Sequence, residues 1–338
     1  MGLLHVRDPG LLATVQDAGR YGWQRFGVVV AGAMDLLAYR IANVLVGNPP
    51  DAAAIEFTLT GGRWEIEGEP RRVAVTGAAF LAAVDGRPVP AWRSFLLRPG
   101  QVLTIGRAED GLRGYLAVAG GVDVAPVLGS RSTHVRSGIG GWQGRALRPD
   151  DALPLGAAAA GAELELPEAV RWPRPSRLRV VLGPQAGHFG RDAIATLATD
   201  AFLVTADADR MGYRLSGPTL RHAGSDNIVS DGIALGSIQV PASGHPIVLL
   251  ADRQPTGGYP KIATIVTPDI GTIAQVGPGA SLRFEIVELD AARRLRLAWD
   301  AHIAALPGLL RPAETGDPLD SARLLGLNLV GGVTAGEC

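Results

Sequence analysis

Short runs of alternating apolar and polar residues fill most of the chain, and turn residues separate them. Strand-like runs occur at residues 57–60, 64–66, 72–77, 94–97 and 114–119, with Gly or Pro near their ends. Strands that follow one another this closely are typical of an antiparallel barrel or sandwich. The pattern therefore predicts a mainly β protein.

Two segments repeat their apolar residues at helical spacing instead. Residues 34–46 form the first, and Gly47-Asn48-Pro49-Pro50 is a strong signal for its end. The second runs from about Asp290 to Ala305 and has a partly apolar face. That face consists of Leu295, Leu297, Ala298 and Ile303.

Three segments share a Pro-led turn that runs into a strand, at residues 98–105, 277–284 and, more weakly, 148–155. This internal repeat supports a duplicated barrel, although turns of this kind also resemble one another by chance. An alanine-rich run at 157–161 and a Pro-rich segment at 172–175 lie between the copies, and residues 178–182 start a new strand. We therefore expect an N-terminal β-barrel domain over residues 1–170. A C-terminal β-barrel domain with a terminal helix follows over residues 171–338.

Composition narrows the class of protein. The 338 residues are 47% hydrophobic and 19% charged, which is normal for a globular protein with a sizeable core. A net charge of −1 gives no electrostatic basis for binding nucleic acid or an anionic membrane. The one cysteine, Cys338, and the lack of two histidines at ligand spacing predict no disulfide framework and no metal site. Without a signal peptide or an apolar run of ~18 residues, we expect a cytoplasmic protein.

Polar and charged side chains are most concentrated in the segment around Lys261, which is the single lysine among 32 Lys and Arg residues. It lies in a segment, residues 251–263, that follows a buried strand at 247–250 and contains Asp252, Arg253, Gln254, Thr256 and Tyr259. Gly257 and Gly258 would allow a positive φ and a close approach to a ligand. A tight hairpin whose charges face water is the alternative.

Two further polar clusters accompany this segment. The first contains Gln16, Asp17 and Arg20 and leads to Asp35 at the start of the first helix. A satisfied turn network and an ordinary first-turn carboxylate would explain them equally well. The second covers residues 209–215, 230–232 and 236–241, where Gln239 stands alone on an apolar strand and would be costly if buried unpaired.

Together these segments resemble one family across essentially the whole chain. It is named as the C subunit of 5-oxoprolinase, KipA (the KipI antagonist) or allophanate hydrolase subunit 2, and is related to the biotin-dependent carboxyltransferase domain of urea amidolyase. The resemblance implies tandem cyclophilin-like β-barrels with a few short helices and a helical C-terminal segment. Pro255, where Thr is common, is a mild departure. The segments that carry the resemblance are residues 14–20, 32–35, 42–48, 130–132, 140–145, 209–215, 236–241 and 251–263.

The resemblance implies the C subunit of an ATP-dependent 5-oxoprolinase, which opens 5-oxoproline to glutamate together with a KipI-like B subunit and an A subunit. Two copies each of this chain and of the KipI-like protein would fit a two-fold complex. Regulation of KipA type, by binding a KipI-like protein, is one alternative. Carboxyl transfer from carboxybiotin on another chain is the other. The chain has no phosphate-binding G-x-x-x-x-G-K-[ST] loop and no Ala-Met-Lys-Met-like turn for attaching biotin. We therefore expect the complex to use ATP, but the sequence does not identify the subunit that binds it.

Opening a lactam by phosphorylating its carbonyl oxygen needs cations and an acid or base. Lys261, Arg253 and Arg20 are the candidate cations, and Asp252 or Asp17 the candidate proton-transfer group. The other candidates would hold the small polar substrate, and we expect all of these residues to meet in one cleft. They are Gln16, Asp35, Gln239, Gln254, Thr256, Gly257, Gly258 and Tyr259.

Overall fold

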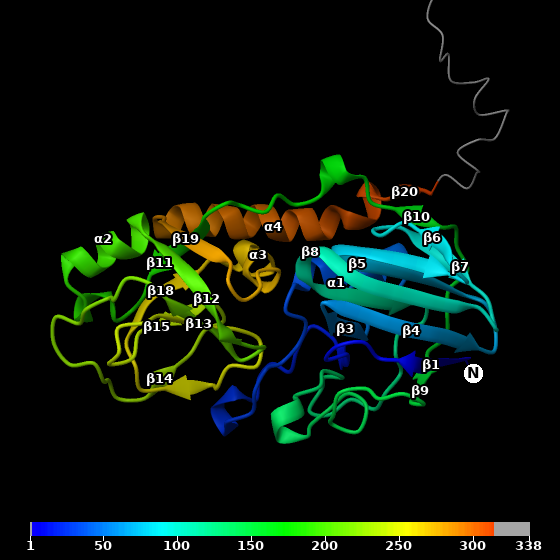
Figure 1. Cartoon of the computed structure of the whole chain (residues 1–338), viewed down its shortest axis with the longest axis horizontal. Coiled ribbons are helices and arrows are strands. Elements are labelled where there is room, and N and C mark those ends of the chain that lie inside the picture. Colours follow the sequence, from blue (N-terminus) through cyan, green and yellow to red (C-terminus); the bar gives the residue numbers. More distant parts are fainter. Residues whose placement is uncertain (1, 314–338) are drawn as a thin grey trace, which may run out of the picture.

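The computed structural model describes residues 2–313, so the last part of the predicted second domain, residues 314–338 with Cys338, lies outside the described residues. Two β structures lie side by side, and one long helix runs across both of them (Figure 1). We call them the N-terminal sheet and the C-terminal barrel. The mainly β fold is confirmed, with one closed barrel and one half-barrel.

The N-terminal sheet has nine strands and is open. Its long central strand β8 pairs with β5 on one side and with β3 and β4 on the other. The path ends at β2 and β9, which each pair with only one neighbour in this sheet. The N-terminal half is therefore an open sheet, and the predicted closed barrel was wrong for this half. The strands are β1 (Gly2–Asp8), β2 (Thr14–Gln16), β3 (Ala54–Thr58), β4 (Thr60–Glu67), β5 (Arg71–Val84), β6 (Arg87–Val89), β7 (Ser94–Leu97), β8 (Val102–Val118) and β9 (Ala152–Leu155).

The C-terminal barrel closes in the order β11-β18-β15-β16-β13-β12-β19. Its strands alternate as expected: in β19 Leu282 and Phe284 face the core while Arg283 and Glu285 are exposed. Among the described strands, the β11–β19 pair alone is parallel. The strands are β11 (Leu178–Leu182), β12 (Ala201–Ala208), β13 (Gly212–Ser216), β15 (Ser237–Gln239), β16 (Ile247–Leu249), β18 (Lys261–Ile265) and β19 (Ser281–Ile286).

Short elements complete the described chain. The turns at 98–105, 148–155 and 277–284 run into β8, β9 and β19, as predicted. The two-stranded ladders are β10 (Leu164–Glu165) with β20 (Arg311–Pro312) and β14 (Asp231–Gly232) with β17 (Thr256–Gly257). The 3₁₀ helices are η1 (Gln24–Phe26), η2 (Val135–Ser137), η3 (Glu168–Val170), η4 (Ala186–His188) and η5 (Thr267–Asp269), and the short α-helices are α2 (Arg191–Thr199) and α3 (Ile270–Ala274).

The two predicted helices are present as α1 (Leu36–Leu45) and α4 (Leu289–Leu309). Asp35 caps α1 by accepting a hydrogen bond from the Ala38 amide. On α4 the buried side chains are Trp299 and Leu306, whereas Leu297 and Ala298 of the predicted face are exposed. The predicted face was wrong there, because Leu297 lies half a turn from the stripe that carries Leu295 and Trp299. No described helix is long and apolar enough to cross a membrane.

Candidate functional site

Lys261 is the first residue of β18, and its side chain is only 3% exposed. Its Nζ donates to Asp231 Oδ2 at 2.9 Å, and the same oxygen accepts from Gln185 Nε2 at 3.2 Å. The Lys261 ammonium holds the pKa of the Asp231 carboxyl below its ordinary value. A hairpin whose charges merely face water is therefore excluded for this lysine.

Amide groups without partners adjoin the lysine. Gln239 is opposite Lys261 in the β15–β18 ladder and is 2% exposed, yet its Nε2 has no hydrogen-bond partner among the described residues. Gln254 Oε1 is likewise buried and has no hydrogen-bond partner in the described part of the chain. A Cβ on Gly257 would lie 2.8 Å from Gln239 Nε2, so these groups converge around a glycine. We call Lys261, Asp231, Gln185, Gln239, Gln254 and Gly257 the lysine cluster.

The predicted role of the two glycines needs a correction. Neither Gly257 nor Gly258 has a positive φ. Gly257 matters because the space beside its Cα is filled by Gln239, and it belongs to the regular β14–β17 ladder. Thr256 and Tyr259 flank it with exposed side chains. The cluster thus offers donors and acceptors for a small polar ligand.

Asp252 pairs with a residue outside the lysine cluster: both of its oxygens accept from Arg210, at 2.9 and 3.0 Å. Arg210 also contacts Glu56 of β3 and donates to the Gly32 carbonyl at 2.6 Å. These neighbouring carboxylates raise the pKa of Arg210 in spite of its burial. Asp252 is therefore part of an ion-pair network that joins the barrel to the N-terminal sheet.

Arg253 belongs neither to the lysine cluster nor to the ion-pair network of Asp252 and Arg210. Its Nε donates to the Ile233 carbonyl and its Nη1 to the Leu250 carbonyl. Burial lowers the pKa of its guanidinium, and it forms no ion pair within residues 2–313.

Asp17 and Arg20 hold a loop of the N-terminal sheet. The Asp17 carboxylate accepts from Gly19 N at 2.8 Å, from Ser130 Oγ at 2.7 Å and from Ser132 Oγ. Arg20 is buried and donates to the Val127 and Ser132 carbonyls, both at 2.8 Å. Burial lowers the pKa of Arg20.

Gln16 completes this third group. It is fully buried, and its Nε2 donates to the Thr133 carbonyl at 3.0 Å. Gln16 Oε1 and Arg20 Nη1 are the buried atoms of the group that lack a partner among the described residues. The group as a whole has the geometry of a turn network that holds the loop in place.

Asp35 connects the two halves at the start of α1. Its Oδ2 accepts from Gln275 Nε2 at 2.9 Å, and Gln275 Oε1 accepts from the amides of Leu112 and Arg113 in β8. Burial raises the pKa of Asp35, and Arg174, 3.6 Å away, opposes that shift.

The structure thus places most of the predicted residues in three groups, the lysine cluster, the ion-pair network of Asp252 and Arg210, and the group of Asp17, Arg20 and Gln16, and leaves Arg253 and Asp35 outside them. Between described residues, no hydrogen bond or ion pair joins these three groups. Asp35 is joined to the ion-pair network, because its amide donates to the Tyr115 hydroxyl, which donates to Glu56. Arg20 and Asp252 interact electrostatically across two of these groups, and Asp252, Arg210 and Arg20 all act on the buried His134. The sequence interpretation included Arg210 and Asp231 in a polar cluster, but it did not name them, or Glu56 and Gln185, as site residues. Their signal was weak, because each pairs with a residue far away in the sequence.

The comparisons with known proteins agree with this architecture. The family model of the carboxyltransferase domain, subdomain A and B, matches residues 26–286. The chain is 39% identical to the C subunit of 5-oxoprolinase from Escherichia coli over 312 residues, which is 89% of this chain and 99% of that relative. It is 38% identical to the C subunit of 5-oxoprolinase from Haemophilus influenzae, with 87% and 94% covered.

Larger proteins share the same unit. Urea amidolyase of Saccharomyces cerevisiae is 31% identical over 90% of this chain, which covers only 18% of that protein. The crystal structure of K. lactis urea amidolyase superposes with a TM-score of 0.83 at 27% identity, covering 90% of this chain and 20% of the other.

An open sheet joined to a closed barrel, matched over residues 26–286, places the chain in the carboxyltransferase domain family, subdomains A and B. Within that family it is a homologue of the 5-oxoprolinase C subunit.

Proposed function

We propose that this chain is the C subunit of an ATP-dependent 5-oxoprolinase, which opens 5-oxoproline to glutamate in the cytoplasm. The main support for this proposal is that the similarity extends over 99% of the E. coli homologue but over only 18% of a urea amidolyase. Each of the two halves, divided near residue 170, is interpreted as a cyclophilin-like unit. ATP is used by the complex, and biotin is not attached to this chain.

The lysine cluster is the proposed site of substrate contact. A buried ammonium can stabilise an oxyanion or a phosphate, because charges interact strongly where water is excluded. The unpaired Gln239 and Gln254 amides supply a donor and an acceptor for a lactam or its carboxylate. Asp231 is half exposed and already hydrogen-bonded to Lys261, so it is the better placed carboxylate for proton transfer. Asp17 and Asp252 are engaged elsewhere.

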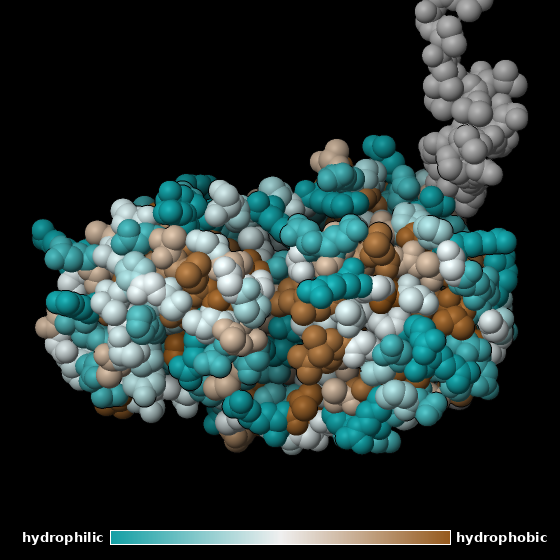
Figure 2. Space-filling model, in the orientation of Figure 1, coloured by the Kyte–Doolittle hydropathy of each residue, from teal (hydrophilic) through white to brown (hydrophobic). Residues whose placement is uncertain are grey.

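The chain is proposed to act with a KipI-like B subunit and an A subunit. In support, large apolar side chains are exposed on residues 21–26, around η1, and on residues 127–135, before η2. Arg20 links these two segments by donating to the carbonyls of Val127 and Ser132. Figure 2 shows apolar side chains along the seam between the two halves on this face. Exposed aromatic groups are typical anchors of protein interfaces. We call these residues the aromatic surface; they are Tyr21, Trp23, Phe26, Val127, Leu128 and Val135.

Reconstitution tests the proposal. The chain is co-purified with its KipI-like partner and the A subunit, and glutamate release from 5-oxoproline is measured with and without ATP. Release that needs both ATP and this chain supports the function. Equal release without this chain contradicts it, and transfer of a carboxyl group from carboxybiotin would favour the carboxyltransferase alternative.

A further inference from the structure

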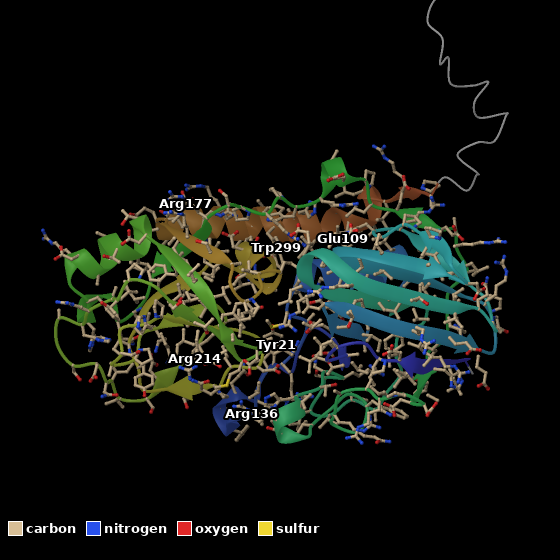
Figure 3. The ribbon with its side chains drawn as sticks, viewed as in Figure 1. Tyr21, Glu109, Arg136, Arg177, Arg214 and Trp299 are labelled. Carbon is tan, nitrogen blue, oxygen red and sulfur yellow. The ribbon has the colours of Figure 1, made fainter. Side chains whose placement is uncertain are left out.

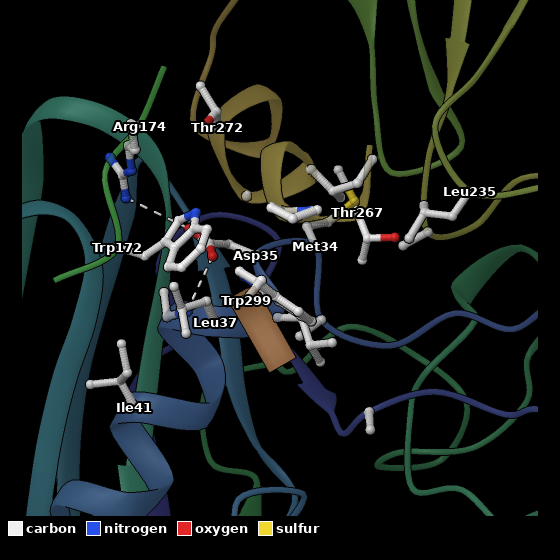
Figure 4. A pocket seen from close by; sticks show the side chains of 18 of the residues that line it. Met34, Asp35, Leu37, Ile41, Trp172, Arg174, Leu235, Thr267, Thr272 and Trp299 are labelled. Atoms are coloured by element: carbon white, nitrogen blue, oxygen red, sulfur yellow. Dashed lines mark hydrogen bonds and ion pairs between the residues drawn. The ribbon is translucent and has the colours of Figure 1, made fainter. Parts of the chain in front are cut away.

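A cavity of about 120 Å³ lies between the N-terminal sheet and the C-terminal barrel, away from the lysine cluster. Its walls come from α1 and the segment before it, from η5 and α3, from α4, and from the connecting residues 171–174 (Figure 4). Trp299 of α4 lies close to α3 in the same region (Figure 3). The wall is mostly apolar and includes Met34, Leu37, Ile41, Ile270, Trp172 and Trp299.

The size of the cavity suits a ligand with one ring. An engineered protein cavity of roughly 150 Å³ lined by apolar side chains holds benzene. Arg174, whose side chain is 41% exposed, and Tyr21, which is 62% exposed, both line the cavity. In the free chain, access from solvent is therefore available beside these two residues.

The charges of the wall favour an anion. Three arginines, Arg171, Arg174 and Arg253, line the cavity, with Asp35 as the only carboxylate in its described wall. Arg174 Nη2 lies 3.6 Å from Asp35 Oδ2, so the charge of Arg174 compensates that of the Asp35 carboxylate. Arg171 and Arg253 form no ion pair between described residues, although Glu168 acts on Arg171 from a distance.

Two buried donors at this wall have no acceptor among the described residues: Arg171 Nε and the indole Nε1 of Trp172. Leaving such groups unpaired is costly, and a carboxylate oxygen would satisfy them. Arg171 also stacks over Trp92, with its guanidinium carbon 4.7 Å from the ring centroid, so its orientation is fixed without a ligand. Gly271 packs directly against the Asp35 carboxylate, where a Cβ would lie 2.7 Å from Oδ1, which holds this side of the cavity in place.

We propose that this cavity is a second ligand site, for a small monocarboxylic acid that carries one apolar ring. The ring lies against Trp172 and Trp299, and the carboxylate accepts from Arg171 and the Trp172 indole. The site is independent of the proposed lactam-opening reaction, since none of the lysine cluster lines it.

Binding to the full chain is measured by tryptophan fluorescence, because Trp92, Trp172 and Trp299 line the cavity. Benzoate is the probe, and benzyl alcohol is its neutral counterpart. We expect benzoate to bind about tenfold more tightly than benzyl alcohol, since a charge-assisted hydrogen bond is worth roughly that factor. Equal affinities, or no saturable change with either probe, would overturn the proposal.

Variants locate the carboxylate. Arg171→Gln should weaken benzoate about tenfold and leave benzyl alcohol unchanged. Trp172→Phe keeps an aromatic wall but removes the indole N–H, so it should weaken the binding of benzoate and not that of benzyl alcohol. This variant also tests the proposal if Arg171→Gln does not fold. Arg177→Gln, an exposed arginine of the same connecting region, is the matched control. An equal loss in Arg177→Gln, or unchanged benzoate binding in Trp172→Phe, would contradict the assignment.

Discussion

Lys261 shows how one residue can combine a charge with almost complete burial. Its ammonium has a single hydrogen-bond partner among the described residues, Asp231, which remains half exposed. A buried lysine with spare donors is ready to bind an anionic ligand, whereas an arginine would need a planar, wider space.

Lys261→Met is therefore expected to lower glutamate release by the reconstituted complex by about a hundredfold or more, or ~3 kcal/mol. The free energy of unfolding should change by no more than about 1 kcal/mol, because Asp231 regains water when the lysine is lost. Lys261→Arg should rescue poorly. Steady-state turnover and thermal melting of each variant are the measurements, and near-normal turnover of Lys261→Met would refute the catalytic role.

His134 gives a pH dependence whose sign follows from its surroundings. Burial lowers the pKa of its imidazole, with Asp252 opposing the shift and Arg210, Arg136 and Arg20 adding to it. The unfolded chain, with an ordinary pKa of about 6.5, then binds a proton first as the pH falls. Stability is thus lost as the pH drops through that value toward the lower folded pKa.

In His134→Gln this loss should be smaller when urea unfolding is compared at about pH 7.5 and about pH 5.5. Burial also lowers the pKa of His302, so the His134→Gln His302→Gln double variant should show the weakest dependence. An unchanged slope in both variants would contradict the prediction.

At the scale of elements, the hydrophobic pattern predicted most of the fold. The first helix was placed at 34–46 and forms at Leu36–Leu45, because its cap and its terminating glycine are both local signals. Closure of a sheet is not local: the open N-terminal sheet depends on which strands β8 pairs with, at long sequence separation. The exposed Leu297 was misplaced because an apolar residue alone does not identify the buried stripe of a helix.

Asp35 joins two elements, so its loss should be felt beyond α1. Asp35→Ala removes the acceptor for both Ala38 N and Gln275 Nε2 and should cost about 1–3 kcal/mol of unfolding free energy. Asp35→Asn, the matched control, keeps the oxygen that accepts from Ala38 N but turns an NH2 group toward Gln275 Nε2, so it should keep the cap, lose the bond to Gln275 and cost about 1 kcal/mol less than Asp35→Ala. Urea unfolding of the two variants measures this difference, and equal losses would show that the cap of α1 contributes little.

At the scale of the whole molecule, the sequence pointed to the right segments but not to their arrangement. Lys261, Gln239, Gln254 and Gly257 do converge, since β15, β18 and the β14–β17 ladder are neighbours. Asp17 and Asp252 do not join them, because each carboxylate is taken up by partners that lie far away in the sequence. Pairing of this kind cannot be deduced from spacing along one chain.

Arg210 connects the halves, with Asp252 on its own side and Glu56 and Gly32 on the other. Arg210→Met leaves two largely buried carboxylates without a counter-ion and should cost about 3–5 kcal/mol. Arg214→Met, which removes an exposed arginine of β13, is the control and should have little effect (Figure 3). Similar unfolding free energies for the two variants in urea would contradict the role of the network.

The aromatic surface carries the last prediction, that the chain binds its KipI-like partner through η1. Trp23 and Phe26 contact each other with ring centroids 5.9 Å apart, and Phe26 is 62% exposed, so the pair is positioned without a partner. Rigid, exposed aromatic groups lose little entropy on binding and commonly dominate interface energies.

We expect wild-type chain co-expressed with the partner to elute from size-exclusion chromatography as one complex of two chains of each kind. Phe26→Asp should weaken it by about 2 kcal/mol or more, roughly thirtyfold, because a charge is forced into an apolar contact. Leu81→Asp, at an equally exposed position on β5, is the matched control and should bind normally. Independent elution of the wild-type proteins would refute the complex, whereas normal binding by Phe26→Asp would move the interface away from η1.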